Sequence, residues 1–346
     1  MTGATSGATT AAGRPAHCTL VAGRDQAPQG SGAGLTIGVD IGGTKVAAGV
    51  VDDSGQIIAA TRWDTPADDN EKTLDVITAA IRELSGEYDV EGVGLGAAGF
   101  VDEHRATVLF APNIAWRAEP LKAELEQRLG LPVVVENDAN AAAWAEVRFG
   151  AGRDEDHVVT LTVGTGIGGG IVLNGELLRG RFGIAAEIGH LNIVPDGRRC
   201  GCGLQGCWEQ YASGRALVLE AQELARRSPE LAAELLGLAG GRPENITGQM
   251  VTQAAYDGDL MALQSFDETG KWLGRGMAEL AAVLDPGLFI IGGGVSAAGE
   301  VLRVPALAAF YKSLTGCAHR PMADVRIAEL GHEAGLIGAA DLVRFR

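Results

Sequence analysis

Short apolar runs, separated by glycine and polar turns, dominate the first half of the chain. The runs at Leu35–Asp40, Val46–Val51 and Val90–Leu95 predict buried strands. Apolar residues recur at helical spacing over Glu71–Leu84, which predicts a helix between the second and third of these strands. Strands that alternate with helices in this way are typical of α/β folds.

The same pattern restarts about halfway along the chain. A strand predicted at Val158–Val163 is followed by a glycine turn, a returning strand at Ile171–Leu173 and a polar hairpin turn at Asn174-Gly175. The first strands of the chain have the same arrangement about 125 residues earlier. We interpret this as an internal repeat and predict two related α/β lobes.

The remaining elements assign residues to the two lobes. We expect residues 35–142 and a C-terminal helix over residues 334–346 to form a smaller lobe, and residues 143–333 to form a larger one. Residues 1–34, largely Gly, Ala, Thr and Ser, are predicted to be a disordered leader, or to follow from an upstream start codon. The other predicted elements are strands at Gln56–Thr61, Pro132–Val135 and Leu288–Ile291, helices at Leu121–Leu129 and Ala139–Phe149, and a helical region over Ala216–Leu284 interrupted near Gly240–Thr247.

Composition excludes several classes of protein. Of 346 residues, 46% are hydrophobic and 21% are charged, which is a globular balance. The net charge of −16, without a local basic patch, argues against a nucleic-acid partner. No uncharged apolar run reaches the roughly 18 residues that a membrane helix needs, and there is no secretory signal. We therefore expect no membrane partner and a cytoplasmic location.

The first glycine-rich turn, Asp40–Lys45, is a candidate phosphate-binding hairpin. Gly42 and Gly43 let the backbone approach an anion closely, Thr44 and Lys45 add donors, and Asp40 could hold a metal-bound water. The turn is not a P-loop, because its order is Gly-Thr-Lys and because a strand, not a helix, follows it. A glycine hairpin without a ligand is the alternative.

Two further glycine turns follow predicted strands. The turn at Gly164–Gly170, in which Gly164, Thr165 and Gly166 come first, contains a formal G-x-G-x-x-G, but the strand after it favours a phosphate-gripping hairpin over a dinucleotide site. The turn at Gly292–Gly294 offers a flat backbone surface for an adenine or ribose, or is simply a tight strand-to-helix turn. Two repeated hairpins and a third turn together favour a nucleotide cleft between the lobes.

Four soft or borderline ligands crowd into a short segment. His190 is followed by Cys200, Cys202 and Cys207, in the pattern H-x9-C-x-C-x4-C. Three thiolates and an imidazole suit a tetrahedral zinc ion and leave no position for water, so we predict a structural zinc site. Free thiols or a disulfide are the alternatives.

Polar residues that suit a sugar cluster near these turns. Asn137 and Asp138 lie at a strand-to-helix junction, where α/β sheets place ligands. Asp138 could instead only cap the following helix. Glu187, His190 and Glu209 flank the cysteine cluster, and carboxylates of this kind accept hydrogen bonds from sugar hydroxyls. Asn113 is a further polar candidate on a loop.

Together these motifs resemble the ROK (repressor, open reading frame, kinase) family of sugar kinases, and most closely its zinc-containing members. The resemblance covers residues 35–346. It implies the two-lobed actin/hexokinase-like fold, in which each lobe contains a ribonuclease-H-like sheet and the lobes close around ATP and a sugar. The motifs are DIGGTK at Asp40–Lys45, ENDANAA at Glu136–Ala142, GTGIGGG at Gly164–Gly170, EIGH at Glu187–His190 and CGCGLQGCWE at Cys200–Glu209.

The resemblance also implies an activity, ATP-dependent phosphorylation of glucose at its 6-hydroxyl with Mg²⁺, and roles for individual residues. Asp138 would be the catalytic base. Sugar contacts would come from Gly99, Asn113, Asn137, Asp138, Glu187, His190 and Glu209. The zinc ligands would be His190, Cys200, Cys202 and Cys207. The first two glycine turns would bind the ATP phosphates, and Gly293 and Gly294 would back the adenosine.

Other readings of the same motifs remain. The acceptor could be another hexose, such as fructose or an N-acetylhexosamine, and the donor could be polyphosphate. The chain could also be a sugar-sensing regulator without catalysis, although such a protein has no need to keep a base and three glycine turns. A homo-oligomer is expected from the resemblance alone.

Overall fold

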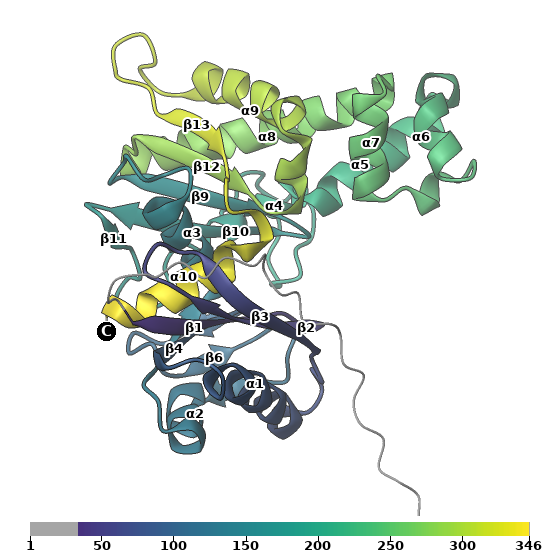
Figure 1. Ribbon diagram of the computed structural model, residues 1–346. Coiled ribbons are helices and arrows are strands. Elements are labelled where there is room, and N and C mark those ends of the chain that lie inside the picture. The colour runs from purple at the N-terminus through teal and green to yellow at the C-terminus, as the bar shows by residue number, and fades with distance from the viewer. Residues whose placement is uncertain (1–33, 346) are drawn as a thin grey trace, which may run out of the picture.

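Two five-stranded sheets with the same topology form the framework of the molecule (Figure 1). This is a computed structural model, which describes residues 34–345. The first sheet has the order β3-β2-β1-β4-β8, and the second has the order β11-β10-β9-β12-β13. The first sheet contains β1 (Leu35–Ile41), β2 (Lys45–Val51), β3 (Ile57–Asp64), β4 (Val90–Ala97) and β8 (Val133–Asn137). The second contains β9 (Val158–Val163), β10 (Ile167–Leu173), β11 (Glu176–Leu177), β12 (Leu288–Gly292) and β13 (Asp324–Ile327).

The strand pairings confirm the internal repeat. In each sheet the first strand in the chain pairs antiparallel with the second and parallel with a later strand, so β9 corresponds to β1, β10 to β2 and β12 to β4. The limits predicted for the two lobes stay a prediction. The leader predicted at residues 1–34 lies outside the described residues, except for Gly34.

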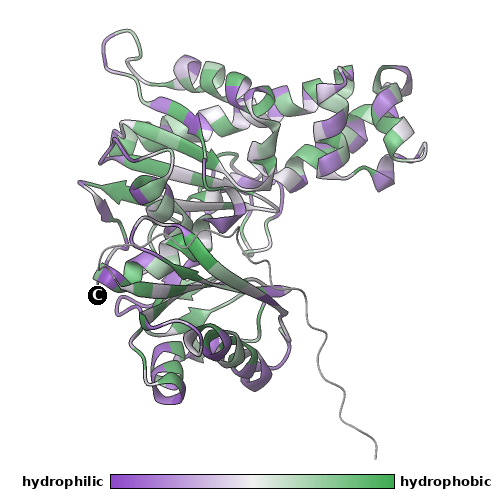
Figure 2. Cartoon of the chain, viewed as in Figure 1, coloured by the Kyte–Doolittle hydropathy of each residue, from purple (hydrophilic) through white to green (hydrophobic). Residues whose placement is uncertain are grey.

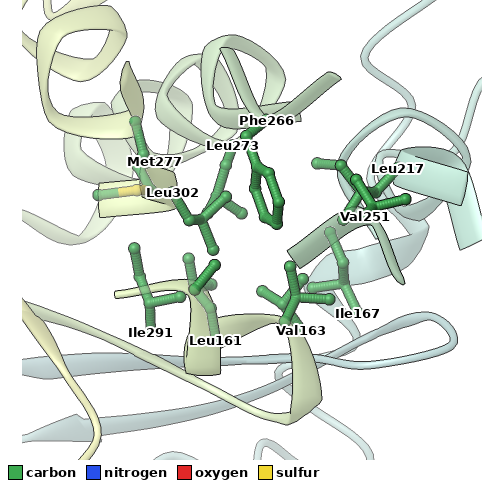
Figure 3. Packing of buried hydrophobic residues seen from close by; sticks show 14 of the residues in the cluster. Leu161, Val163, Ile167, Leu217, Val251, Phe266, Leu273, Met277, Ile291 and Leu302 are labelled. Carbon is green, nitrogen blue, oxygen red and sulfur yellow. The ribbon is translucent and has the colours of Figure 1, made fainter. Parts of the chain in front are cut away.

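Helices cover the outer faces of both sheets. Helices α1 (Asn70–Ser85) and α2 (Leu121–Leu129) pack on the first sheet, and their polar residues face solvent (Figure 2). Helix α8 (Leu260–Leu284) packs on the second sheet together with α9 (Glu300–Ser313). Figure 3 shows this contact, in which Phe266 and Leu273 of α8 face Leu161 and Val163 of β9.

The long helical region predicted over Ala216–Leu284 is divided into several helices. Helices α5 (Gly214–Arg227), α6 (Ala233–Leu238) and α7 (Gly248–Tyr256) precede α8 and project to one side of the second sheet (Figure 1). The interruption predicted near Gly240–Thr247 is confirmed. A three-stranded sheet of β5 (Phe100–Val101), β6 (Val108–Phe110) and β7 (Arg117–Glu119) was not predicted, because strands of two or three residues show no alternating pattern.

Helices α3 (Asp138–Phe149) and α10 (Ala334–Leu342) lie between the two sheets (Figure 1). The C-terminal helix packs on β1 and β4, as predicted, and also on α3. Glycines make this approach possible. A Cβ on Gly94 of β4 would lie 1.7 Å from the carbonyl oxygen of Ala339, and one on Gly338 of α10 would lie 1.8 Å from that of Ala141.

The second glycine turn is shorter than predicted. Only residues 164–166 form the turn, and β10 begins at Ile167. Gly168 and Gly170 are strand residues, and their missing side chains let α3 approach: a Cβ on Gly170 would lie 2.3 Å from the Cβ of Ala143. Two of the five glycines in this run, Gly168 and Gly170, therefore serve helix packing.

Among residues 34–345, no helix is both long enough and apolar enough to cross a lipid bilayer.

Substituting Gly338 with Ala should destabilise the protein by about 2 to 3 kcal/mol, because the new methyl group meets backbone that cannot rotate away. Gly237, an exposed residue of α6 with no atom within 4 Å of its Cβ position, is the matched control. There Ala should stabilise by up to about 1 kcal/mol through helix propensity. Urea unfolding measures both, and equal stabilities for the two variants would contradict the packing described above.

Candidate functional site

The first glycine turn has two backbone N–H groups free for an anion. The amide of Gly42 donates to the carbonyl of Lys45 at 2.9 Å, and the carbonyl of Gly42 accepts from the hydroxyl of Thr65. Within residues 34–345, the amides of Gly43 and Thr44 donate no hydrogen bond. Successive free amides of this kind form an anion-binding concavity.

The second turn repeats this arrangement. The amide of Gly164 donates to the carbonyl of Gly166 at 3.0 Å, and the carbonyl of Gly164 accepts from the amide of Gly214 at 2.8 Å. The amides of Thr165 and Gly166 have no hydrogen-bond acceptor in the described part of the chain. The two corresponding hairpins of the repeat therefore offer the same kind of anion site.

Lys45, predicted as a donor to the first turn, forms an ion pair with Asp64, the residue opposite it on β3. Both side chains are exposed, and the role of Lys45 in anion binding stays a prediction. A second cation, Arg62, acts on Asp40 at the start of the turn.

A cavity of about 830 Å³ lies beside the second turn. The third glycine turn forms another edge through Gly294. The preceding Gly293 has φ +80°, and a Cβ there would lie 2.5 Å from the carbonyl oxygen of Val163. The sequence did not indicate the rest of this wall, because it comes from helices α5 and α7, far away in the chain. Its polar and aromatic members are Arg215, Thr247, Gln249, Thr252, Gln253 and Tyr256.

Asp138 is free to act chemically, because Asn137 caps helix α3. The Asn137 side chain accepts hydrogen bonds from the amides of Ala139 and Asn140, at 2.9 and 3.0 Å. Asp138 accepts one hydrogen bond, from the amide of Ala139 to Oδ1 at 2.9 Å. Among the described residues none donates to its Oδ2, so this oxygen can accept a proton or a hydrogen bond.

Several predicted sugar-site residues lie beside Asn137 or beside one of the two glycine turns. The side-chain amide of Asn137 donates to the carbonyl of Gly99 at 3.1 Å. Asn113 lies against the first glycine turn, since a Cβ on Gly43 would come within 3.0 Å of its side chain. Oε2 of Glu209 lies against the second turn, 2.3 Å from the position of a Cβ on Gly166.

Carboxylates crowd in this site, and their pKa values reflect it. Burial raises the pKa of Asp138. Burial, and then the charge of Asp138, raise the pKa of Asp40 to about 6, although Arg62 opposes the shift. Burial also raises the pKa of Glu187, where His190 opposes and the charges of Asp138 and Glu209 add to the effect. Charge–charge interactions weaken with distance, so these effects indicate that acidic side chains from both halves of the repeat lie in one region.

The four predicted zinc ligands form one compact cluster. Their ligand atoms all lie within 4.8 Å of one another. Nδ1 of His190 is 3.7 Å from Sγ of Cys200, and Sγ of Cys202 is 3.6 Å from Sγ of Cys207. Tetrahedral zinc with Zn–S bonds of about 2.3 Å requires sulfur atoms roughly 3.8 Å apart, so the geometry fits zinc. The cysteines of the cluster are free in this structure, since a disulfide has an S–S distance of about 2.05 Å.

The cysteine loop is fixed to the protein and to the acidic site. Trp208 is fully buried, and its indole donates to the carbonyl of Trp272 in α8 at 2.9 Å. Sγ of Cys200 lies 3.0 Å from Oε1 of Glu209. A metal in this cluster would hold His190 through Nδ1 and, through Cys207, the start of the segment that carries Glu209.

Comparison with known proteins agrees with this geometry. Residues 36–346 match the ROK family. The chain belongs to the ROK family. The glucokinase of Streptomyces coelicolor is 52% identical over 311 residues, which are 90% of this chain and 98% of that protein.

Two solved ROK structures have the same fold. The crystal structure of a ROK family glucokinase from Streptomyces griseus in complex with glucose and AMPPNP has a TM-score of 0.83, with 57% identity over 90% of this chain and 100% of that one. The ROK hexokinase from Thermus thermophilus has a TM-score of 0.74, with 37% identity over 88% of this chain and 96% of that one. These likenesses confirm the predicted two-lobed sugar-kinase fold.

We expect the metal content of this ROK protein to depend on Cys202. Serine at this position should reduce bound zinc from near one equivalent per chain to a small fraction, because it replaces a thiolate with a poor zinc ligand. Elemental analysis after gel filtration measures this. Cys317, an exposed cysteine outside the cluster, is the matched control, and Cys317→Ser should retain the metal. Equal zinc contents in the two variants would contradict the ligand assignment.

The raised pKa of Asp40 predicts a pH-dependent stability. Between the unfolded pKa of about 4 and the folded value of about 6, the folded state binds more protons, so the contribution of Asp40 to stability falls as pH rises through this range. Relative to wild type, Asp40→Asn should therefore gain stability from pH 4 to pH 6.5, by the order of 1 to 2 kcal/mol.

Urea unfolding at several pH values measures this difference. Asp53→Asn, at an exposed position in the β2–β3 turn, is the control for the removal of one carboxylate. A pH-independent difference between Asp40→Asn and wild type would contradict the effect of burial on Asp40.

Proposed function

We propose that this chain is a glucose kinase, which transfers the γ-phosphoryl group of ATP to the 6-hydroxyl of glucose with Asp138 as general base. The observation that carries the proposal is the position of Asp138. Its unbonded Oδ2 lies in a cluster of carboxylates that suits a polyhydroxylated acceptor, and the two turns with free amides come from the same two sheets. The 52% identical relative and the solved complex are both named glucokinases, and that complex contains glucose and the ATP analogue AMPPNP.

On the donor side, the cavity of about 830 Å³ would take the adenosine, with Gly293 and Gly294 behind it. Free amides at Gly43, Thr44, Thr165 and Gly166 would bind the phosphates. Mg²⁺ bound with ATP would neutralise charge on the transferred group, and Asp40 is the carboxylate at the first turn that would hold its water shell.

On the acceptor side, Asn137 and Asp138 would orient the reacting hydroxyl. Glu187 and Glu209 would accept hydrogen bonds from other hydroxyls, and His190 would face the sugar through Nε2 while Nδ1 binds zinc. Gly99 and Asn113 would complete the sugar contacts. The zinc would have a structural role here, because it holds the loop that carries Glu209.

The proton of the sugar hydroxyl would pass to Oδ2 of Asp138 as the hydroxyl oxygen attacks phosphorus, and ADP would leave. The pKa of Asp138 is raised above that of a solvated aspartate, which makes it a better base once ionised. Water could attack in place of the sugar, so closure of the two lobes around bound sugar would suppress ATP hydrolysis.

The acceptor and donor can be tested against the alternatives in one assay. Formation of the sugar phosphate over a panel of glucose, fructose and N-acetylhexosamines, with ATP or polyphosphate as donor, should be fastest with glucose and ATP. Sugar binding without phosphorylation of any sugar would favour a sensing role. We also propose a cytoplasmic homo-oligomer, on the likeness to the family alone.

The most direct test of the mechanism is Asp138→Asn. It should lower kcat by roughly 10²- to 10⁴-fold, which is the usual contribution of a general base. Glucose affinity by calorimetry should change little, because the amide still accepts the hydrogen bond from Ala139 and still meets the sugar hydroxyl. Asp53→Asn, on the surface, serves as the activity control. An unchanged kcat in Asp138→Asn would refute the base assignment.

A further inference from the structure

The residue before Asn137 is a fully buried carboxylate, Glu136. Its Oε1 accepts hydrogen bonds from the amide of Asn137 at 2.9 Å and from the side chain of Asn140 at 3.2 Å. Its Oε2 lies 3.1 Å from Nε of Arg105 and 2.7 Å from Nε of Arg179. A carboxylate is rarely buried to this degree unless its charge is paired, and here two guanidinium groups pair it.

The two arginines come from different parts of the chain. Arg105 lies in the turn between β5 and β6, where it has φ +54° and where Asp102 accepts hydrogen bonds from the following amides. Arg179 follows β11, at the edge of the second sheet. Its Nη1 and Nη2 donate to the carbonyls of Glu103 and Asp102, at 3.0 and 2.8 Å. Arg179 thus joins the second sheet to the turn that carries Arg105.

Each of the three segments continues into the proposed sugar site. The segment of Arg105 starts after Gly99, Glu136 directly precedes Asn137, and the segment of Arg179 leads to Glu187 and His190. The segment of Arg179 also packs closely against the segment of Arg105, because a Cβ on Gly183 would lie 2.4 Å from the carbonyl oxygen of Val101.

We propose that Arg105, Glu136 and Arg179 form a positioning triad, which aligns the three sugar-binding segments and so determines the affinity for the sugar and the orientation of Asp138. The inference rests on the proposed function. None of the triad residues lines the cavity assigned to adenosine. Loss of the triad should therefore affect the acceptor and not the donor, a selectivity that a general loss of stability does not produce.

The test compares substitutions at two arginines of one loop. Arg179→Met removes a member of the triad. Arg179→Lys keeps the positive charge but lacks the planar guanidinium that contacts Glu136 and two backbone carbonyls. Arg181→Met is the matched control, since the contacts of Arg181 within residues 34–345 are an exposed ion pair with Glu103, at 3.3 Å, and a cation–π contact with the neighbouring Phe182. The measurements are kcat, the KM for glucose, the Kd for AMPPNP by calorimetry and the zinc content.

For Arg179→Met we expect a rise of at least tenfold in the KM for glucose and a lower kcat, with a Kd for AMPPNP within twofold of wild type and zinc retained. Arg179→Lys should recover part of the loss, and Arg181→Met should equal wild type. An unchanged KM for glucose, or equal losses of glucose and AMPPNP affinity, would overturn the proposal.

Two further measurements decide the question if a variant does not fold or if the wild type is inactive. If Arg179→Met does not fold, Glu136→Gln gives the same readouts with a side chain of equal size, and the same outcomes decide. If wild type releases no ADP with any sugar, the proposed function fails, whereas glucose affinity by calorimetry in wild type and in the variants still tests the triad separately.

Discussion

Close backbone packing around helix α3 is the constraint on which the site depends. The helix lies between the two sheets because β10 presents Gly170 to it, and because α10 meets it at Gly338. Side chains at either position would collide with backbone or Cβ atoms that cannot move away. The N-terminus of this helix is Asp138, so the glycines determine where the proposed base stands relative to both glycine turns.

One strand connects the parts of the site. The turn before β10 offers the free amides of Thr165 and Gly166, and one face of the strand supports α3. On the other face, a Cβ on Gly169 would lie 2.4 Å from the side chain of Ile188, which follows Glu187. The turn at residues 164–166, the helix that begins with Asp138 and the segment of Glu187 therefore all pack on one strand, which limits how far any of them can shift alone.

The features that could be predicted from the sequence are those that a short stretch of residues encodes. The repeat, the glycine turns and the ligand cluster each lie within a short stretch whose residue types carry the chemistry, and DIGGTK and the cysteine loop were recognisable for this reason. It did not predict the wall of the cavity formed by α5 and α7, or the pairing of Glu136 with Arg179, because these contacts join segments far apart in the chain. It also interpreted Gly168 and Gly170 as a turn, because the absence of a side chain looks the same whether a ligand or a helix fills the space.

Because the site is acidic, backbone amides suit anion binding there better than cationic side chains do. Mobile cationic side chains can pair with carboxylates: Lys45 forms an ion pair with Asp64, and Arg62 opposes the rise in the pKa of Asp40. Amides in a hairpin cannot swing toward a carboxylate, and their direction is set by the hydrogen bonds that close the turn. In a chain with a net charge of −16, these fixed amides are suited to the proposed phosphate sites beside a cluster of carboxylates.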